Sequence, residues 1–536
     1  MSDPASRSSG LFSGLRIVSV CTLLSRVLGL VRDVGMAALF GNGPVMDAFS
    51  IAFRIPNLAR RLFGEGAMTA AFLPEFVREL EHSGRAAAWR LASAAFVTLA
   101  AALAGVVLVV ELLLGVASLV WPLSAEAELL VGLTATLLPY MALICLAAQV
   151  SAVLHAVDHF TWPALLPVLL NAVWIGAIWF VAPYFATPVE QVYGIAVCIL
   201  FAGVGQVGVS IAVLFRLGFR YEFDWRATRA RVGNIARMML PVLVGLSITQ
   251  LNTLSDSLIA WVFSSPEGAG AAEISTQPLR SGTASALYFA QRMYQFPLGV
   301  FGVALGTVLF PLLSRHAQRG ELDRLQGDLS LGLRLVLMIG LPASAGLMLL
   351  AGPLTDVLFR HGAFDAADAA QTALMIATYG AGVWAYCGLL IVVRGFYAIG
   401  DPRTPLRIGL VLVVLNVAMN LTLIWPLGAQ ALAGSTALCA MLQAFVAIRW
   451  LEHRVGRLDW RSLRSTCVRV VAATAVMSVV CLLVLAQMPD SERMSLRVAR
   501  VAVPFTAAVA SYLVAVRVLK LNEFWLLLRR SGERES

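Results

Sequence analysis

Charged residues are scarce in this chain of 536 residues, and lysine is almost missing. Only 13% of the residues are charged, whereas 59% are hydrophobic. Because soluble domains carry about 25% charged residues, this composition excludes a water-soluble fold. Lys520 is the only lysine, so no phosphate-binding loop of the P-loop type occurs before it.

Sequence signatures of catalysis are missing as well. The chain has no HExxH or GxSxG motif, and no paired aspartates of the kind that bind magnesium diphosphate in polyprenyl transferases. Its seven cysteines are widely separated without CxxC spacing, which predicts that they pack between helices. We therefore expect a protein that is not an enzyme and that needs no cofactor other than a coupling ion.

Long apolar runs recur from one end of the chain to the other. Windows of about 20 residues predict roughly fourteen membrane-spanning helices. These spans lie near residues 14–40, 45–80, 91–119, 129–155, 162–184, 190–215, 238–263, 283–313, 331–358, 370–398, 404–425, 429–450, 467–487 and 498–519. The predicted fold class is an all-α polytopic membrane protein.

The positive charge is distributed over alternate loops. A net charge of +9 can indicate nucleic-acid binding, but the arginines form no single basic face, so no nucleic-acid partner is expected. The arginine-rich loops lie at 78–90, 216–237, 315–324 and 449–464, and the loops without arginine or lysine at 41–44, 121–128, 182–191 and 425–429. By the positive-inside rule the arginine-rich loops are cytoplasmic, and with them both termini.

A weak internal repeat relates the two halves of the chain. The turn at 155–163 matches the turn at 397–405 in length, and each turn opens a new span at its proline. The other matched positions are Pro56, Gly66 and Pro74 with Pro297, Gly302 and Pro311. A repeat of six spans implies two six-helix lobes around a central cavity, with alternating access between them. Chance similarity of proline and glycine positions in apolar sequence is the alternative.

This repeat predicts three parts of the chain. They are an N-terminal lobe of residues 1–225, a C-terminal lobe of residues 226–460, and a pair of C-terminal helices with a cytoplasmic tail at 461–536.

The first predicted span contains Arg26, Arg32 and Asp33. Each charge at the centre of a span costs roughly 2.5–3.5 kcal/mol on an insertion scale, so these groups need water or a partner. Arg26 and Arg32 are about 120° apart around a regular helix, so they face one cavity only if it is wide or if the helix bends, for example at Gly29. Arg26 and Asp33 share a face.

Further charges interrupt two other spans. The second span contains Asp47, Arg54, Arg60, Arg61 and Glu65, and the eighth contains Arg292. The planar guanidinium fork suits diphosphate or carboxylate groups, so an excess of arginine predicts a cavity for an anionic substrate. Adjacent Arg60 and Arg61 cannot both point inward. Interhelical salt bridges to the nearby acids are the alternative for these arginines.

A group of oxygen-bearing side chains occurs in the seventh, eleventh and twelfth spans. Its members are Asp256, Asn416, Asn420 and Thr436. Such oxygens can bind a sodium ion, and the aspartate can carry a proton. Hydrogen bonding between helices explains the same residues equally well.

Four segments resemble one protein family, the bacterial lipid II flippases of the MurJ (MviN) family, in the superfamily of multidrug, oligosaccharidyl-lipid and polysaccharide exporters. They are SRVLGLVRD at 25–33, RIPNLARRLFGEGA at 54–67, FPLGVFGVALGT at 296–307 and GFYAIGDPRTP at 395–405. The resemblance extends over essentially the whole chain. It implies fourteen helices, two lobes, and a C-terminal helix pair whose groove accepts an undecaprenyl tail.

The resemblance also implies a substrate site and a function. The implied substrate residues are Arg26, Arg32, Arg60 and Arg292, which meet the diphosphate, with the acids Asp33, Asp47 and Glu65 beside them. The implied function is movement of lipid II across the bacterial inner membrane for peptidoglycan assembly, with the cell-wall synthesis machinery as a further partner. Flipping of another polyprenyl-diphosphate oligosaccharide, or drug/cation antiport, are the alternatives.

The chain departs from this family at three positions. Gln291 and Gln295 stand where some relatives have acids, which leaves an acidic partner for Arg292 in doubt. Some relatives bind sodium at positions that match Asp256 and its neighbours, and some have an acid where this chain has Asn420.

Overall fold

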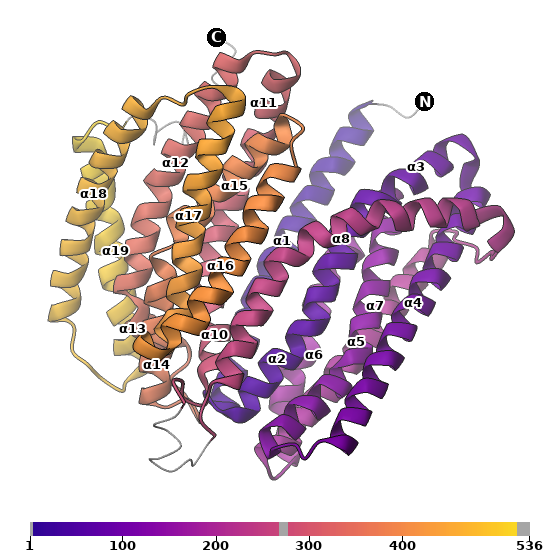
Figure 1. The fold of residues 1–536 in the computed structure, drawn as a ribbon, viewed down its shortest axis with the longest axis horizontal. Helices are drawn as coiled ribbons and strands as arrows, with labels where there is room; N and C mark the ends of the chain where they lie inside the picture. The colour runs from indigo at the N-terminus through magenta and orange to yellow at the C-terminus, as the bar shows by residue number, and fades with distance from the viewer. Residues whose placement is uncertain (1–3, 267–276, 522–536) are drawn as a thin grey trace. The chain divides into compact units, whose positions relative to one another are not determined.

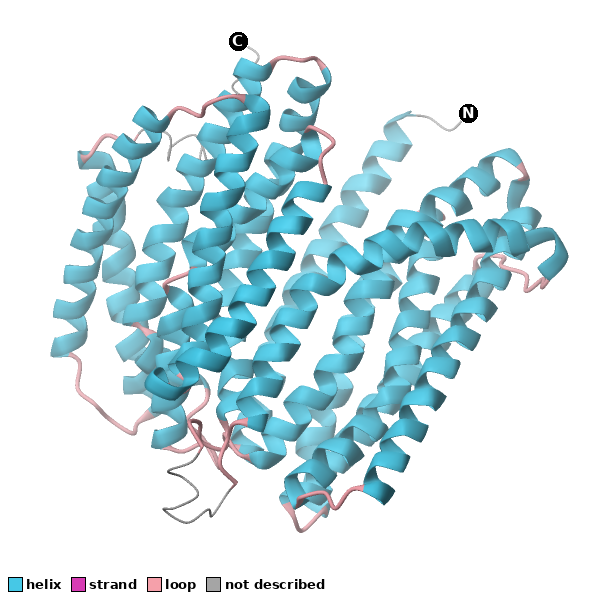
Figure 2. Ribbon diagram, viewed as in Figure 1, coloured by secondary structure: helices cyan, strands magenta, loops and turns pink. Residues whose placement is uncertain are grey.

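Helices are the regular elements of this protein in its computed structural model, which describes residues 4–266 and 277–521 (Figure 2). Within these ranges the β pairing is limited to one isolated bridge between Ser264 and Leu279. The all-α prediction is therefore confirmed. The seven cysteines are free, as their spacing predicts.

The chain divides into two compact units, Met1–Leu254 and Ser255–Ser536, and the division falls inside helix α8 (Figure 1). The elements of the first unit are α1 (Pro4–Phe40), α2 (Pro44–Ala59), the π-helix η1 (Arg60–Phe72), α3 (Leu73–His82), α4 (Gly84–Val120), α5 (Ala125–Ala156), α6 (Thr161–Gly176), the short helices η2 (Ala177–Val181) and η3 (Ala182–Tyr184), α7 (Pro188–Arg216) and most of α8 (Trp225–Val262).

The second unit begins within α8 and continues with further long helices. They are α10 (Thr283–Pro297), the π-helix η4 (Leu298–Gly302), α11 (Val303–Gln318), α12 (Leu322–Leu349), α13 (Ala351–Leu358), α14 (Ala366–Gly380), α15 (Val383–Ala398), α16 (Arg403–Leu427), α17 (Gln430–Val455), α18 (Trp460–Gln487) and α19 (Met494–Val518). Helices α18 and α19 pack against each other and against α12, where the Tyr512 hydroxyl donates to the Met338 carbonyl at 2.6 Å.

Nine helices of the described chain are long and apolar enough to cross a membrane, or eleven if each of two bent pairs counts as one span. The other three predicted spans, near 14–40, 45–80 and 238–263, are helical too. The first two of these contain the charged residues singled out above. The protein is thus a multi-pass membrane protein, while the count of fourteen spans stays a prediction.

The same helix packing occurs in both units. Helix α5, at the fourth predicted span, packs against α2, α4 and α7. Helix α15, six spans later, packs against α11, α12 and α17, which are six spans later than those neighbours. A π-helix interrupts the second span after Pro56 and the eighth span after Pro297. The packing therefore agrees with the six-span repeat inferred from the sequence.

The two matched turns are closed by equivalent hydrogen bonds. His159 N donates to Leu154 O at 2.9 Å, and Asp401 N donates to Phe396 O at 2.9 Å. The residue before each donor is left-handed, with φ of +60° at Asp158 and +75° at Gly400. A hydrogen bond of this kind beside a left-handed residue is a common way for a helix to end. The two turns therefore resemble each other in structure as well as in sequence.

Replacing Gly400 with alanine should destabilise the protein, because a Cβ in the left-handed region costs about 1–2 kcal/mol. Crowding is not the cause, since a Cβ at Gly400 would meet nothing within 4 Å. The matched control is Gly346→Ala inside α12, where a Cβ also meets nothing within 4 Å. That variant should be unchanged or more stable by up to about 1 kcal/mol. The midpoint of thermal unfolding in detergent distinguishes the two, and equal midpoints would contradict the turn geometry.

Candidate functional site

The two arginines of the first span have different surroundings. Helix α1 is continuous from Pro4 to Phe40. Arg26 is exposed and makes no hydrogen bond or ion pair within the described residues. The Arg32 residue is only 6% exposed. The sequence allowed both arginines to face one cavity, but in this structure only Arg26 reaches a surface of the first unit.

Arg32 is held by an ion pair inside the first unit. Its Nη2 and Nε atoms donate to Asp33 Oδ1 at 2.7 and 3.0 Å, and Asp33 is 2% exposed. Its Nη1 atom donates to Asn171 Oδ1 on α6 at 3.0 Å. The guanidinium carbon also lies 4.3 Å from the centre of the Trp174 ring, in cation–π contact. The salt-bridge alternative from the sequence thus describes the Arg32 and Asp33 pair.

Asn171 joins α6 to two levels of α1. While its Oδ1 atom accepts from Arg32, its Nδ2 atom donates to the Ser25 carbonyl at 3.0 Å. Gly29 lies between these levels, and a Cβ on it would come within 3.7 Å of the Asn171 amide nitrogen. The rotation of α1 that buries Arg32 and exposes Arg26 is therefore fixed by one buried asparagine.

The charged residues of the second span point in several directions. Arg60 is half-buried and donates to Asn57 Oδ1 at 3.1 and 3.3 Å, whereas Arg61 Nη1 donates to Gln250 Oε1 on α8 at 3.4 Å. The two adjacent arginines thus have different partners, and which of them faces a cavity stays a prediction. Asp47 is 2% exposed in the first turn of α2, where a helix N-terminus favours a carboxylate. The side chain of Glu65 lies outside the described residues.

Arg292 lies beside aromatic residues in the second unit. Its Nη2 atom donates to the Tyr288 hydroxyl at 3.0 Å, and its guanidinium carbon is 5.1 Å from the centre of that ring. Gln291 donates to the Tyr379 hydroxyl on α14 at 3.2 Å. Where some relatives have an acid before the arginine, this chain thus has an amide that joins α10 to α14.

The four oxygen-bearing residues of the predicted ion site do come together in the second unit. Asp256 Oδ1 accepts from Asn420 Nδ2 at 2.7 Å, and its Oδ2 accepts from Thr436 Oγ1 at 3.1 Å. Asn416 Oδ1 accepts from Asn420 at 3.1 Å, and Asn416 Nδ2 donates to Thr436 at 3.2 Å. Both Asp256 and Asn416 are 1% exposed. The cluster joins α8, α16 and α17.

The chemistry of this cluster fits a small hard cation or a proton. One carboxylate, two amides and a hydroxyl supply oxygen atoms, and rotating the amide groups would turn their oxygens toward a common centre. Without an ion, the same groups satisfy the carboxylate with hydrogen bonds. In the described chain, no group of three or more His, Cys, Asp or Glu residues could hold a metal ion.

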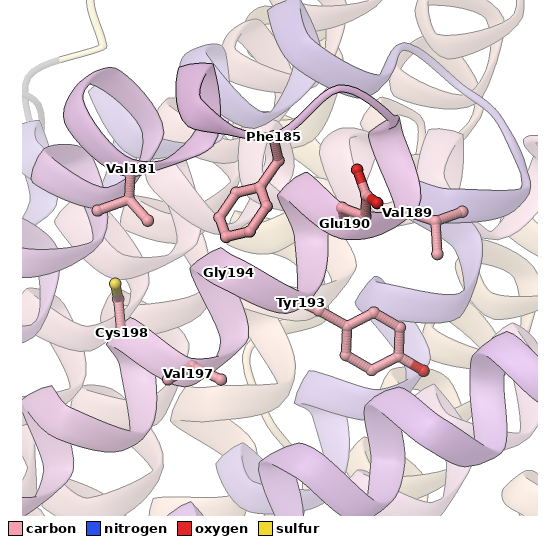
Figure 3. Close-up of a pocket in the computed structure, with 8 residues that line it drawn as sticks. All are labelled: Val181, Phe185, Val189, Glu190, Tyr193, Gly194, Val197 and Cys198. Atoms are coloured by element: carbon pink, nitrogen blue, oxygen red, sulfur yellow. The ribbon is translucent and has the colours of Figure 1, made fainter.

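A pocket of about 410 Å³ lies elsewhere in the first unit, lined by residues of η2, of α7 and of the segment that joins them. Figure 3 shows Phe185 beside Gly194, with Val181 to the left of Phe185 and with Val197 and Cys198 below. None of the predicted substrate residues lines this pocket. Its only acid, Glu190, accepts from the Thr187 amide at 3.1 Å. With an apolar lining and no arginine, the pocket does not suit an anionic headgroup.

Several residues of these sites were missed from the sequence. Asn171 and Trp174 complete the surroundings of Arg32, and Tyr288 and Tyr379 those of Arg292 and Gln291. The partners of Asn171 lie 139 and 146 residues away along the chain, so no local pattern could have revealed them.

Solved structures share this fold. A structure described as a lipid II flippase in an inward-closed conformation matches with a TM-score of 0.74 and 21% identity, over 96% of this chain and 99% of the other. An inward-facing multidrug transporter of the MATE family matches with a TM-score of 0.65 and 14% identity, over 84% of this chain and 99% of the other. The chain thus shares the multi-pass helical fold of these two structures.

Sequence comparison defines the family within this class. The sequence model described as "Lipid II flippase MurJ" matches residues 36–496. The "Probable lipid II flippase MurJ" of Vibrio cholerae is 32% identical over 82% of this chain and 83% of its own length. The "Lipid II flippase MurJ" of Burkholderia cenocepacia is 33% identical over 83% and 84%. The chain belongs to the MurJ family of lipid II flippases, as its motifs indicated.

Replacing Arg32 with methionine should destabilise the protein strongly. It leaves the Asp33 carboxylate buried without its ion pair, which typically costs about 3–5 kcal/mol. Thermal unfolding in detergent measures the loss. The double variant Arg32→Met, Asp33→Asn should regain much of the stability, because it removes the unpaired charge. A single variant as stable as the native protein would show that the pair contributes nothing.

Proposed function

We propose that this protein is a flippase that moves lipid II from the cytoplasmic to the outer leaflet of the bacterial inner membrane. Membership of the MurJ family supports the substrate class, because lipid II flippase is the activity that its relatives' names state. The observation that carries the proposal is Arg26, an exposed arginine in the first predicted span that makes no hydrogen bond or ion pair within the described residues. Such a group is stable in a membrane only beside water or an anion.

In this proposal Arg26 makes the first contact with the diphosphate of the substrate. A guanidinium can donate two parallel hydrogen bonds to phosphate oxygens, and it keeps its charge throughout transport. Arg60 and Arg292 are the next candidates, because both are half-buried. Arg32 then acts as a positioning residue, since its hydrogen bond to Asn171 of α6 helps to set the rotation of α1.

Transport requires movement and no chemistry on the substrate, so the protein acts as a transporter and not as an enzyme. The six-span repeat supports alternating access of two lobes. The undecaprenyl tail stays in lipid while the headgroup crosses. The membrane potential supplies roughly 2.3 kcal/mol per charge per 100 mV, and an ion gradient adds to it.

We propose that the coupling ion, sodium or a proton, binds at Asp256. Its carboxylate is almost fully buried and the surrounding oxygens belong to three helices. An ion bound there would change how α8, α16 and α17 pack, which is how a gradient can act on a conformational equilibrium.

The proposed location is the inner membrane, with both termini in the cytoplasm, as the distribution of arginines favours. Lipid II is the proposed ligand. The cell-wall synthesis machinery is a proposed partner that would consume it.

Two other functions compete with this one. A flippase for a different polyprenyl-diphosphate oligosaccharide would need the same arginines. A drug/cation antiporter has some support from the fold shared with a MATE transporter. However, a cation substrate calls for acidic residues at the surface, whereas Asp33 is buried in its pair with Arg32.

Replacing Arg26 with glutamine should abolish transport of lipid II without loss of stability. The side chain is exposed and unpaired, so the stability change should stay within about 0.5 kcal/mol. The measurement is flux of a fluorescent lipid II into the far leaflet of vesicles that contain the purified protein. Arg26→Lys, which keeps the charge but not the fork, should retain part of the flux.

The control is an exposed arginine in a cytoplasmic loop, Arg220→Gln, which should transport normally. Native flux in a folded Arg26→Gln protein would refute the role of Arg26. The same vesicles loaded with an O-antigen lipid instead of lipid II test the competing substrate, and faster flux of that lipid would favour it.

Sodium should raise the unfolding temperature of the native protein relative to potassium at equal ionic strength, because an ion that binds only the folded state stabilises it. Asp256→Asn should remove this shift, since the carboxylate provides the charge that attracts the cation. If neither sodium nor a change of pH shifts the native protein, Asp256 serves only to join helices.

A further inference from the structure

Helix α4 carries one charged residue within its apolar part, and the transport site makes no use of it. From Ala100 to Val120 the sequence is apolar except for Glu111 and Ser118. Glu111 makes no hydrogen bond or ion pair with any described residue. It lies ten residues before Trp121, about 15 Å along the helix. This distance is half of the ~30 Å thickness of the hydrocarbon core.

The surface around Glu111 is left open by the rest of the first unit. Only 6% of the most apolar stretch of α4 is buried, compared with 28–50% in the other eight long apolar helices of the described chain. Helix α4 packs mainly on α5 and α3, and it borders the first unit beside α5 (Figure 1). A Cβ placed on Gly105 or Gly115 would meet nothing within 4 Å.

One side of α4 combines this open surface with the carboxyl group. Because residues three, four and seven apart share a helix face, Ala104, Leu108, Gly115 and Ser118 lie on the same side as Glu111. Leu108 is 69% exposed. Small residues let a second helix approach closely, and a carboxyl group within hydrocarbon requires a donor on that helix. Lipid chains supply no such donor.

A second copy of this chain is a poorer source of the donor through α4. Two copies in one membrane are parallel, so α4 of the second copy would present the same residues at the same depth. From Val107 to Gly115 the only polar side chain is Glu111 itself, and two Glu111 carboxyl groups satisfy each other only while at least one of them is protonated. A basic or amide side chain of a different protein donates to the ionised carboxylate as well, so the chemistry favours a helix of a different protein.

We infer that this face of α4 is a docking site for a transmembrane helix of another integral membrane protein. That helix carries a basic or amide side chain at the depth of Glu111. The contact is separate from lipid II transport, since it does not involve Arg26 or the other substrate residues. It fits a flippase that is recruited to a membrane-embedded partner.

Photocrosslinking in living cells tests this inference with the full chain. A photoreactive benzoylphenylalanine at Leu108 reports on the side of Glu111. The matched control places it at Leu113, which is 62% exposed but lies about 200° around the helix from Glu111. We expect one protein adduct from position 108 and not from position 113. The adduct should be lost in Glu111→Leu and persist in Glu111→Gln.

Mass spectrometry of the crosslinked peptide then identifies the partner helix. It should contain Arg, Lys, His, Asn or Gln within one turn of the crosslinked residue. Four results would overturn the inference: an adduct with a second copy of this chain, an adduct that survives Glu111→Leu, a partner segment without a donor, or no protein adduct at all.

Purified Glu111→Leu protein separates docking from folding and transport. In lipid nanodiscs it should unfold at the same or a higher temperature than the native protein, because an uncompensated carboxyl group has been removed from hydrocarbon. Its lipid II flux in vesicles should be unchanged. A lower unfolding temperature would mean that Glu111 has an internal partner, which contradicts the docking site. Absence of flux in the native protein would contradict only the proposed transport function.

Discussion

Arg32 and Asp33 lie next to each other in α1, and the first unit is organised around keeping their charges satisfied. The two side chains form an ion pair, Asn171 completes it from α6, and Trp174 covers the guanidinium. In a medium of low dielectric constant an unpaired charge is very costly, so this arrangement resists rotation of α1 about its axis. The same rotation brings Arg26 to the surface. In this structure the exposed Arg26 is thus positioned together with a buried ion pair.

The second unit also has a buried carboxylate in the first span of its repeat. There the first helix is α8, whose Asp256 is held by Asn420 of α16 and by Thr436 of α17. In both units an asparagine of a helix four spans later binds the charged group, Asn171 at Arg32 in the first unit and Asn420 at Asp256 in the second. Asp33 is paired with Arg32, whereas Asp256 accepts hydrogen bonds from the neutral side chains of Asn420 and Thr436. Of these two carboxylates, Asp256 is the one for which we propose an ion or proton.

Glu111 differs from both because nothing in the described chain compensates it. The three carboxyl groups show one rule applied at three positions in the membrane. Asp33 is neutralised by the chain itself, Asp256 suits neutralisation by an ion, and the exposed side of α4 leaves Glu111 to another molecule. The group that compensates each carboxyl therefore differs: a residue of the same helix for Asp33, an ion in our proposal for Asp256, and a partner helix in our inference for Glu111.

The sequence by itself determined the class of fold, the repeat and the family. Apolar runs and loop arginines reflect the membrane directly, because every span must satisfy the same lipid environment. The equivalent turns at Asp158 and Gly400 could be matched from sequence since helix ends depend on a few neighbouring residues. The sequence, with the family resemblance, also predicted that Asp256, Asn416, Asn420 and Thr436 belong to one cluster.

Only the tertiary structure decided which charges are available. Arg26 and Arg32 look alike in the sequence, and both were expected to meet the substrate. Their surroundings differ because Asn171, far away in the chain, approaches α1 on one side. The rotation of a helix about its axis is set by such contacts with its neighbours, and no pattern within the helix specifies it. For the same reason, only the packing of α4 shows that Glu111 lies on a surface that the rest of the first unit leaves open.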